Sequence, residues 1–252
     1  MPKGAAGRLA YLLKLIADGP PSFTLTTLSE RSGLPTSTVH RLLQELVRSG
    51  LIERAEGQAY RAGWELYLLA SRMVARFDLI RCARPFLEEL GAHWKETVVL
   101  CAYSPAGRNA VISDLVLTPH PLRYAIDVGV IIELPWGSLG RAILAHLPIE
   151  HRRVILSEHK IGPISGRPLP ELATMEANLA QDRAQGFSRH YDPENDLAGI
   201  ASPIFGRGNE VLGCVGVTMP AKRFGFHAEE ELARAVREAS AALSEKARIA
   251  QS

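Results

Sequence analysis

Residues 25–46, LTTLSERSGLPTSTVHRLLQEL, predict two short helices joined by a tight turn at Ser32-Gly33-Leu34-Pro35. The second helix would bury four apolar side chains that recur at the spacing of one helix face, namely Val39, Leu42, Leu43 and Leu46. Its opposite face carries side chains that can hydrogen-bond, namely Thr36, Ser37, Thr38, His40, Arg41 and Gln44. The stretch therefore predicts one helix with a buried apolar side and an outward polar side.

A second helix presented after a glycine turn is what a helix-turn-helix places in the major groove of DNA. Arg41 and Gln44 are the candidates for base edges, because a guanidinium can bridge guanine and a carboxamide can bridge adenine. Ser37, Thr38 and His40 are expected to bond phosphates, and Thr36 is a further candidate for DNA contact. An isolated polar face is also typical of an ordinary solvated surface. The elements that flank this helix decide between a solvated face and a DNA-binding face.

Those elements complete a winged helix-turn-helix over residues 1–63. An apolar stripe over 9–16 predicts a first helix, which ends at Asp18-Gly19-Pro20-Pro21. Thr26, a further candidate for DNA contact, is placed as the N-cap of a helix over 27–31, and the third helix ends at 49–50. Residues 51–61 predict two short strands around Glu56-Gly57. Arg54 and Arg61 flank that turn, where they could meet phosphates.

Beyond this domain the pattern predicts a linker helix within residues 64–79 and an α+β domain over 80–252. Helices are expected at 80–94, 139–146, 149–156, 170–185 and 228–249. Strands are expected at 97–103, 110–117, 122–127, 199–205 and 211–218. Strands at both ends of the domain with helices between them indicate a mixed sensor domain around an antiparallel sheet.

Composition agrees with a folded, ligand-binding protein of the cytoplasm. The 252 residues are 46% apolar and 22% charged, with a net charge of +2. Residues 1–78 hold ten Lys and Arg against seven Asp and Glu, a small surplus that suits phosphate binding and an ordinary surface equally. Cys82, Cys101 and Cys214 are expected to be thiols, and no leader, membrane span, metal-ligand set or cofactor motif is evident.

Two other function classes were weighed. An enzyme is disfavoured, because residues 136–140 (WGSLG) lack the glycine of a nucleophile elbow two places before Ser138. Gly206-Arg207-Gly208 likewise lacks the later glycine of a dinucleotide fingerprint. A winged-helix module that binds protein rather than DNA is the other alternative; binding to duplex DNA that weakens steeply with salt would exclude it.

Five motifs occur in an order that resembles the isocitrate lyase regulator family of bacterial transcription factors. They are LPTSTVHRLL at 34–43, YRAG at 60–63, GRAILA at 140–145, RAQGF at 183–187 and IASPI at 200–204. The resemblance implies a DNA-binding domain, a linker helix and a GAF-like domain that binds a small effector. It also implies homodimers, often paired into homotetramers, on a roughly palindromic operator, and it favours repression.

The resemblance also places the effector site. The implied residues are Tyr124, Trp136, Gly137, Ser138, Leu139, His190, Tyr191, Leu197, Gly199, Gly216 and Thr218. Carboxylate-binding members carry an acidic residue, a cysteine and serines where this chain has Tyr191, Gly199, Gly216 and Thr218. Because glycine and aromatic residues replace hydrogen-bonding groups, we expect a larger aromatic or otherwise apolar organic acid. Ordinary core packing is the alternative for Trp136, His190 and Tyr191.

Overall fold

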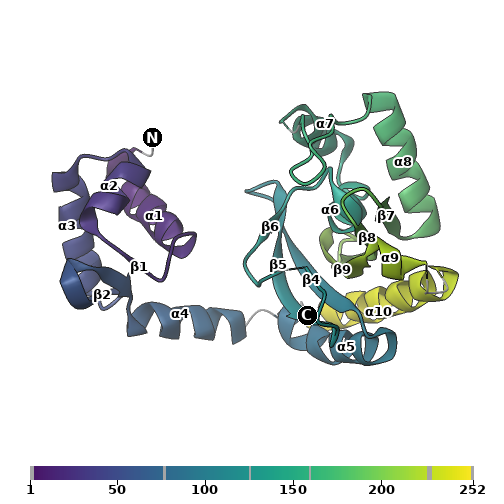
Figure 1. Ribbon diagram of the computed structural model, residues 1–252, viewed down its shortest axis with the longest axis horizontal. Coiled ribbons are helices and arrows are strands. Elements are labelled where there is room, and N and C mark those ends of the chain that lie inside the picture. The colour runs from purple at the N-terminus through teal and green to yellow at the C-terminus, as the bar shows by residue number, and fades with distance from the viewer. Residues whose placement is uncertain (1–2, 76–77, 125, 159, 226–228, 251–252) are drawn as a thin grey trace. The chain divides into compact units, whose positions relative to one another are not determined.

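The computed structural model describes residues 3–75, 78–124, 126–158, 160–225 and 229–250 and divides into two compact units, Met1–Phe77 and Asp78–Ser252 (Figure 1). The first unit contains α1 (Gly4–Ala17), β1 (Ser22–Phe23), α2 (Leu25–Ser32), α3 (Thr36–Arg48), β2 (Ile52–Arg54), a 3-10 turn (Glu56–Gln58), β3 (Tyr60–Ala62) and α4 (Trp64–Ala75). The strands form a sheet in the order β1-β3-β2. Leu12, Leu28 and Leu43, one from each of the first three helices, lie at the centre of the unit's core.

Three local features of this unit differ from the sequence prediction. The N-cap of α2 is Thr24, whose hydroxyl accepts a hydrogen bond from the Thr27 amide at 3.1 Å, so the assignment of Thr26 as the cap was wrong. Strand β1 was missed because two residues are too few to show a period. The turn of the wing is a 3-10 turn, in which Gly57 and Gln58 both have positive φ.

Gly63 explains why the YRAG motif ends in glycine. A Cβ at this position would lie 2.2 Å from the carbonyl oxygen of Gly50, closer than any side chain allows. The Gly63 amide donates instead to the Leu51 carbonyl at 2.9 Å. The backbones at Gly63 and Gly50 therefore lie too close for a side chain at position 63, where β3 leads into α4, and only glycine fits.

The second unit is built on a six-stranded sheet. Its helices are α5 (Asp78–Trp94), α6 (Gly137–Leu144), α7 (Ile149–Glu158), α8 (Leu172–Gln185), α9 (Ala221–Phe224) and α10 (Glu229–Ala250). Its strands are β4 (Thr97–Ser104), β5 (Asn109–Val116), β6 (Ile131–Ile132), β7 (Ser188–Asp192), β8 (Leu197–Phe205) and β9 (Val211–Pro220). They run antiparallel in the order β6-β5-β4-β9-β8-β7.

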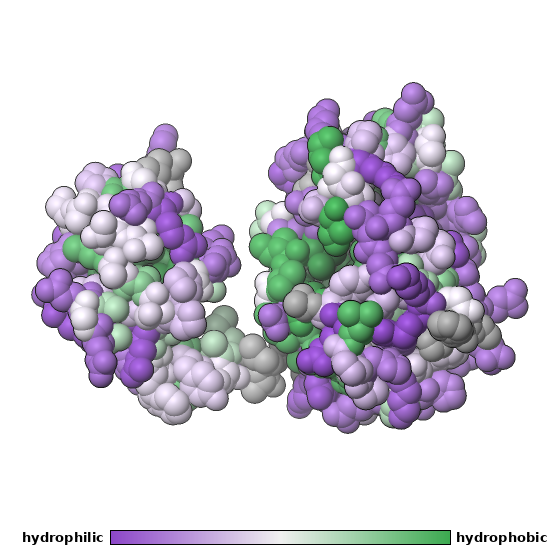
Figure 2. Space-filling model, viewed as in Figure 1, coloured by the Kyte–Doolittle hydropathy of each residue, from purple (hydrophilic) through white to green (hydrophobic). Residues whose placement is uncertain are grey.

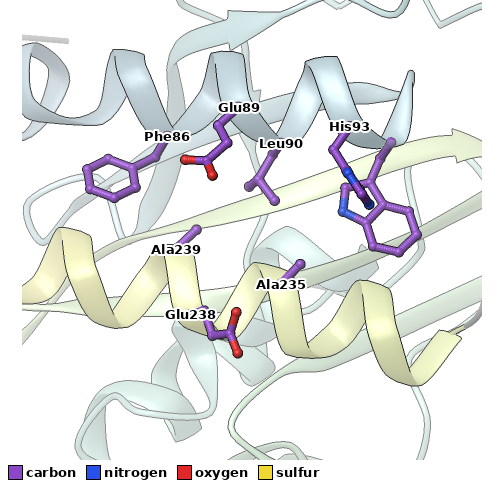
Figure 3. Close-up of a pocket in the computed structure, with 8 residues that line it drawn as sticks. Phe86, Glu89, Leu90, His93, Ala235, Glu238 and Ala239 are labelled. Atoms are coloured by element: carbon purple, nitrogen blue, oxygen red, sulfur yellow. The ribbon is translucent and has the colours of Figure 1, made fainter.

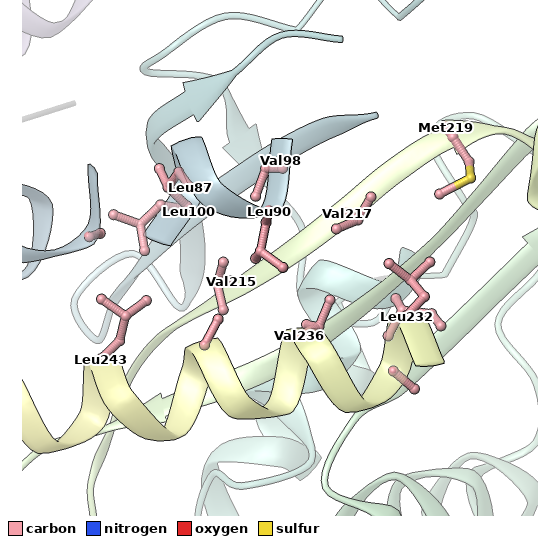
Figure 4. Packing of buried hydrophobic residues seen from close by; sticks show 14 of the residues in the cluster. Leu87, Leu90, Val98, Leu100, Val215, Val217, Met219, Leu232, Val236 and Leu243 are labelled. Atoms are coloured by element: carbon pink, nitrogen blue, oxygen red, sulfur yellow. The ribbon is translucent and has the colours of Figure 1, made fainter. Parts of the chain in front are cut away.

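Each face of this sheet has its own apolar core, because successive side chains of a strand point to opposite faces. On one face Val98, Val215 and Val217 pack with α5 and α10 (Figure 4). On the other, Val99, Ala201 and Cys214 pack with α6, α7 and α8. The two faces are called the α5/α10 face and the α6 face below.

The sequence prediction erred at the two edges of this sheet. The described residues of 122–127 form no strand, and the edge strand is β6 at Ile131–Ile132. Strand β7 was missed, since its SRHYD sequence does not alternate clearly between apolar and polar residues. Helix α4 ends at Ala75, the expected linker residues 76–77 lie outside the described residues, and Asp78 begins α5. The expected start of the last helix at Ala228 also lies outside them.

Candidate functional site

Helix α3 divides into a buried and an exposed side. Val39, Leu42, Leu43 and Leu46 are buried in the core of the first unit. Among the predicted DNA-binding side chains, Thr36, Ser37, His40 and Arg41 are exposed, while Thr38 and Gln44 are half-buried. The helix therefore turns a polar, hydrogen-bonding face outward, as its sequence predicts.

The turn that presents α3 is held by local hydrogen bonds. Gly33 ends α2 in the left-handed conformation, with φ at 63°, which glycine adopts without strain. The Ser29 hydroxyl donates to the Leu34 carbonyl at 2.9 Å and lies 3.1 Å from the Thr36 hydroxyl. The start of α3 is thus fixed to α2, which sets the angle at which the polar face is presented.

Arg41 and His40, both on the polar face of α3, differ in the contacts that they make within the protein. Arg41 has no ion pair within the part of the chain that the structure describes, so its guanidinium is available to a ligand. Nε2 of His40 lies 3.4 Å from Nε2 of Gln44 one turn later. Thr26, in the first turn of α2, is exposed although it does not cap the helix.

The two arginines of the wing are also engaged differently. Arg61 donates from Nε to Oε1 of Glu53 at 2.5 Å, directly across the β2–β3 pair. Arg54 is exposed and, among the described residues, forms no ion pair. Arg54 is therefore the cation of the wing that can reach a phosphate without breaking an existing contact.

In the second unit several of the predicted effector residues lie at one end of the α6 face. Strand register aligns His190, Gly199, Thr218 and Thr97 directly across β7, β8, β9 and β4, so these four residues share a face. They form a row that crosses the sheet next to the start of α6. Ser138, in the first turn of α6, lies over this row.

The two glycines of this end are filled by α6. A Cβ at position 199 would lie 3.0 Å from Oγ of Ser138, and a Cβ at position 216 would lie 2.8 Å from a methyl group of Leu139. Gly199 and Gly216 thus let the helix approach the strands closely. At these two positions the absence of a side chain makes room for α6 rather than for a ligand.

The start of α6 presents backbone amides that have no partner within the helix. Trp136, at the N-cap position, supplies no side-chain hydrogen bond to these amides. Nε1 of Trp136 is also buried, and within the described part of the chain it has no hydrogen-bond partner. Buried donors of this kind, together with the positive end of the helix dipole, suit an anionic or carbonyl oxygen.

Burial keeps the imidazole of the row uncharged at neutral pH. The pKa of His190 is lowered chiefly by burial, an effect that Asp192 partly offsets and Arg141 and Arg189 reinforce. Arg141 itself is held in a bidentate ion pair with Asp182, which ties α6 to α8. His190 is therefore a neutral hydrogen-bonding group that faces the start of α6.

Tyr191 does not join the row. Strand alternation places it on the α5/α10 face, where its ring lies 5.8 Å from that of Phe224 and Arg189 stacks on both rings. Leu197, opposite Asp192, is on the α6 face at the outer end of β8. The prediction for Tyr191 is corrected accordingly, because β7 was not recognised and its alternation could not be applied.

Tyr124 approaches the row from the segment before β6. Its hydroxyl donates to the Asp196 carbonyl at the start of β8. Burial and the nearby Asp196 raise the pKa of Tyr124 to about 12, so the phenol stays protonated. Ile126, two residues later, packs into the core of the α6 face and was missed by sequence reasoning, since no periodic pattern surrounds it.

Two surface pockets lie away from this end of the sheet. One, of about 380 Å³, is a groove on the α5/α10 side, where Phe86, Glu89 and His93 face Ala235 and Glu238 (Figure 3). The other, of about 500 Å³, lies between the end of α7 and residues 160–172. Neither is lined by a predicted effector residue.

Several alternatives find no support in the geometry. Ser138 is buried in the first turn of α6, so residues 136–140 do not form the exposed strand-to-helix turn of a nucleophile elbow. Within the described ranges, no group of three or more His, Cys, Asp or Glu side chains could hold a metal ion. A search of the described helices found none long and apolar enough to cross a membrane.

Comparisons with known proteins agree with this two-unit architecture. The IclR helix-turn-helix domain model matches residues 5–56, and the model described as bacterial transcriptional regulator IclR C-terminal matches residues 71–245. The HTH-type transcriptional regulator Rv1719 of Mycobacterium tuberculosis is 33% identical over 91% of this chain and 86% of its own. The transcriptional repressor IclR of Escherichia coli is 27% identical over 84% of this chain and 78% of its own.

A solved structure shows the same fold. An IclR homologue from Microbacterium hydrocarbonoxydans, crystallised with 4-hydroxybenzoate, superposes with a TM-score of 0.84 at 22% identity, covering 98% of this chain and 100% of its own. Family models match both units, and the relatives align over most of both chains. The chain therefore belongs to the IclR family of bacterial transcriptional regulators, with an N-terminal helix-turn-helix and a C-terminal effector domain.

Proposed function

We propose that this chain is a ligand-responsive repressor whose helix α3 reads a DNA operator. The observation that carries the proposal is the polar face of α3, exposed while its apolar face fills the core of the first unit. In this assignment Arg41 and Gln44 contact base edges. The side chains that contact the DNA backbone are Thr26, Thr36, Ser37, Thr38 and His40. Arg54 and Arg61 contact the flanking phosphates from the wing.

Replacing Arg41 with alanine tests this assignment. The operator is selected from a randomised duplex library by the wild-type protein, and affinity is measured by fluorescence anisotropy at several salt concentrations. Arg41→Ala should weaken specific binding by about 1–3 kcal/mol and relax the preference at one base position. Lys14→Ala, which removes a cation from α1, is the matched control and should leave that preference unchanged.

Equal affinity and equal base preference for Arg41→Ala and the wild type would remove Arg41 from base readout. Failure of the wild type to enrich any duplex would contradict DNA recognition itself and favour the protein-binding alternative. Binding that does not weaken as salt rises would have the same meaning, because phosphate contacts release counterions.

We further propose that the protein acts as a homodimer, or a pair of dimers, on a palindromic operator. Helix α4 exposes Trp64, Tyr67 and Met73, which are 67%, 60% and 72% accessible. Large apolar side chains gathered on one short helix favour a protein interface. The second unit carries another apolar patch beside β6 (Figure 2), where Val128 and Ile131 are exposed. Half-sites should be about one helical turn apart, or a multiple of it.

For the effector we propose a small organic acid with an apolar or aromatic body. Its carboxylate would accept hydrogen bonds at the start of α6, from the amides of Gly137, Ser138 and Leu139 and from Nε1 of Trp136. The apolar body would lie against Tyr124 and Ile126, with Thr218 and neutral His190 at its polar end. The 4-hydroxybenzoate bound by the Microbacterium homologue is a ligand of this chemistry.

A thermal-shift series on the full chain tests this proposal with 4-hydroxybenzoate, benzoate and glyoxylate. A ligand that binds only the folded protein raises the melting temperature, and at equal concentration a tighter ligand raises it more. We expect the aromatic acids to stabilise more than glyoxylate, and Trp136→Phe, which keeps a ring but removes the N–H, to reduce the shift. Stabilisation by glyoxylate alone would contradict the aromatic assignment, and an unchanged shift in Trp136→Phe would contradict the place of the carboxylate.

A further inference from the structure

Residues 117–124 and 126–130, which lie between β5 and β6, are called the strap. Its first half follows the end of the sheet. The Thr118 hydroxyl donates to the Lys95 carbonyl before β4, Nη1 of Arg223 donates to the Leu122 carbonyl at 2.9 Å, and the Tyr124 hydroxyl donates to the Asp196 carbonyl before β8. The strap therefore extends from the β5 side of the sheet as far as the start of β8.

The second half of the strap returns on the α6 face. Ile126 packs into the core of that face, and the backbone then pairs with β5, where Gly129 donates to the Ile112 carbonyl at 2.7 Å. In the sheet, β4 and β9 separate β8 from β5. The strap therefore passes the end of β4 and β9, where Thr97 and Thr218 lie, and the Thr118 amide donates to the Thr97 hydroxyl at 3.2 Å. It thus runs beside the proposed effector site.

One guanidinium ties the strap to the body of the unit. Arg223 donates from Nε and Nη2 to the two carboxylate oxygens of Glu96, both at 2.7 Å, while Nη1 holds the Leu122 carbonyl. Only 1% of the Glu96 side chain is accessible, so the carboxylate fixes the position of the guanidinium. By contrast, 68% of the Leu122 side chain is accessible, so apolar burial does not anchor the strap at this residue.

We propose that the Glu96–Arg223 ion pair is a latch that holds the strap beside the effector site and sets how fast an effector enters and leaves. The proposal rests on the proposed place of the effector. Arg223 acts on the effector through the strap and is a positioning residue. When the hydrogen bond from Nη1 of Arg223 to the Leu122 carbonyl is lost, Leu122 is no longer held in place. The strap then opens more often.

The second unit contains a matched control. Arg152 also forms two hydrogen bonds to one carboxylate, that of Glu176, and a third to a backbone carbonyl, that of Leu147 at 2.7 Å. This pair joins α7 to α8 and does not touch the strap. Arg223→Met and Arg152→Met therefore remove the same set of contacts, and only the first should act on the strap.

The test measures amide hydrogen exchange in the full chain, together with the dissociation rate of 4-hydroxybenzoate in stopped flow. In Arg223→Met we expect exchange over residues 117–131 and dissociation to be about tenfold faster, the effect of losing a charge-assisted hydrogen bond. Arg152→Met should change neither. Arg223→Lys, which keeps the charge but not three fixed donors, should give an intermediate rate.

Unchanged strap exchange in Arg223→Met would overturn the latch, and so would equal acceleration in Arg152→Met. Faster exchange with an unchanged dissociation rate would overturn the control of effector exchange. If 4-hydroxybenzoate does not bind the wild type, the effector assignment fails, while the exchange measurement still decides whether Arg223 holds the strap. The two proposals therefore fail in distinguishable ways.

Discussion

The proposed DNA-binding face and the proposed effector site differ in how the chain assembles them. The face lies mostly on one helix, where residues 36–44 supply six of its candidate side chains. The effector site draws on the strap, α6, β7, β8 and β9, which span residues 117–220. The helix period of 3.6 residues places the side chains of the α3 face on one side of the helix, so this face can be predicted without knowledge of the fold. The residues of the effector site can be grouped only once strand register and helix packing are known.

The two units also differ in how deeply the ion pairs considered below are buried. Breaking the buried Arg141–Asp182 pair of the second unit should have the largest effect of the substitutions proposed. Arg141 and Asp182 join α6 to α8 through a bidentate contact, with 20% and 4% of their side chains accessible. Burial raises the pKa of Asp182, an effect that Arg141 and Arg183 oppose. Asp182→Ala would leave a half-buried guanidinium without its counter-ion, at a cost of about 3–5 kcal/mol to the second unit.

Urea unfolding in a Trp64→Phe background measures this loss, because Trp94 and Trp136 then report only on the second unit. Amide exchange in the first unit is the internal control and should not change. A loss below about 1 kcal/mol would mean that solvent reaches the pair as it reaches a surface ion pair.

Glycine motifs illustrate what sequence alone can and cannot predict. GRAILA and YRAG identify the family, and the structure gives the reason: a Cβ at Gly140 would lie 2.6 Å from the Glu133 carbonyl, as one at Gly63 would clash with Gly50. Gly199 and Gly216 were predicted, from the resemblance, to contact an effector. They are filled by residues some 60 to 80 positions earlier in the chain, a contact that no local pattern encodes.

The next effect in size is expected at Gly63. Gly63→Ala forces the wing away from Gly50 and should destabilise the first unit by about 3 kcal/mol, at the upper end for overpacking. Native-state amide exchange should show the loss in β2, β3 and α3 but not in the second unit. Gly57→Ala, where a Cβ meets no atom within 4 Å but φ is +66°, measures the cost of backbone strain without a clash, whereas Gly63→Ala tests a clash at a glycine whose φ is not positive. A loss in Gly63→Ala no larger than that in Gly57→Ala would mean that the approach to Gly50 costs no more than a strained backbone.

A smaller and pH-dependent effect is expected at His146, which follows α6. Burial, with the nearby charge of Arg183, lowers its pKa to about 4, and its ring packs edge-on against Phe205 at 5.0 Å. Above about pH 6.5 the imidazole is neutral in both folded and unfolded chains. Below that value the unfolded chain binds a proton that the folded chain refuses, so stability falls as the pH drops towards 4.

Because the ring is partly accessible, we expect this loss to be on the order of 1–2 kcal/mol. His146→Phe keeps the aromatic contact and removes the titration, so its unfolding midpoint in urea should fall less between pH 7 and pH 5. His190, whose pKa burial also lowers, remains in both proteins and cancels from the comparison. Parallel pH dependence in wild type and variant would exclude His146 as the source.

The smallest effect concerns an exposed ion pair of the first unit, Arg61–Glu53. Arg61 and Glu53 are 60% and 43% accessible, so the pair should contribute less than about 1 kcal/mol to stability. In the free protein Glu53 competes with phosphate for the guanidinium. Glu53→Ala should therefore strengthen operator binding by no more than about fivefold, whereas Arg61→Ala should weaken it and lower the salt dependence by about one counterion. If Glu53→Ala instead weakens binding, the carboxylate orients Arg61 towards the DNA, and even this surface pair would be part of the DNA-binding site.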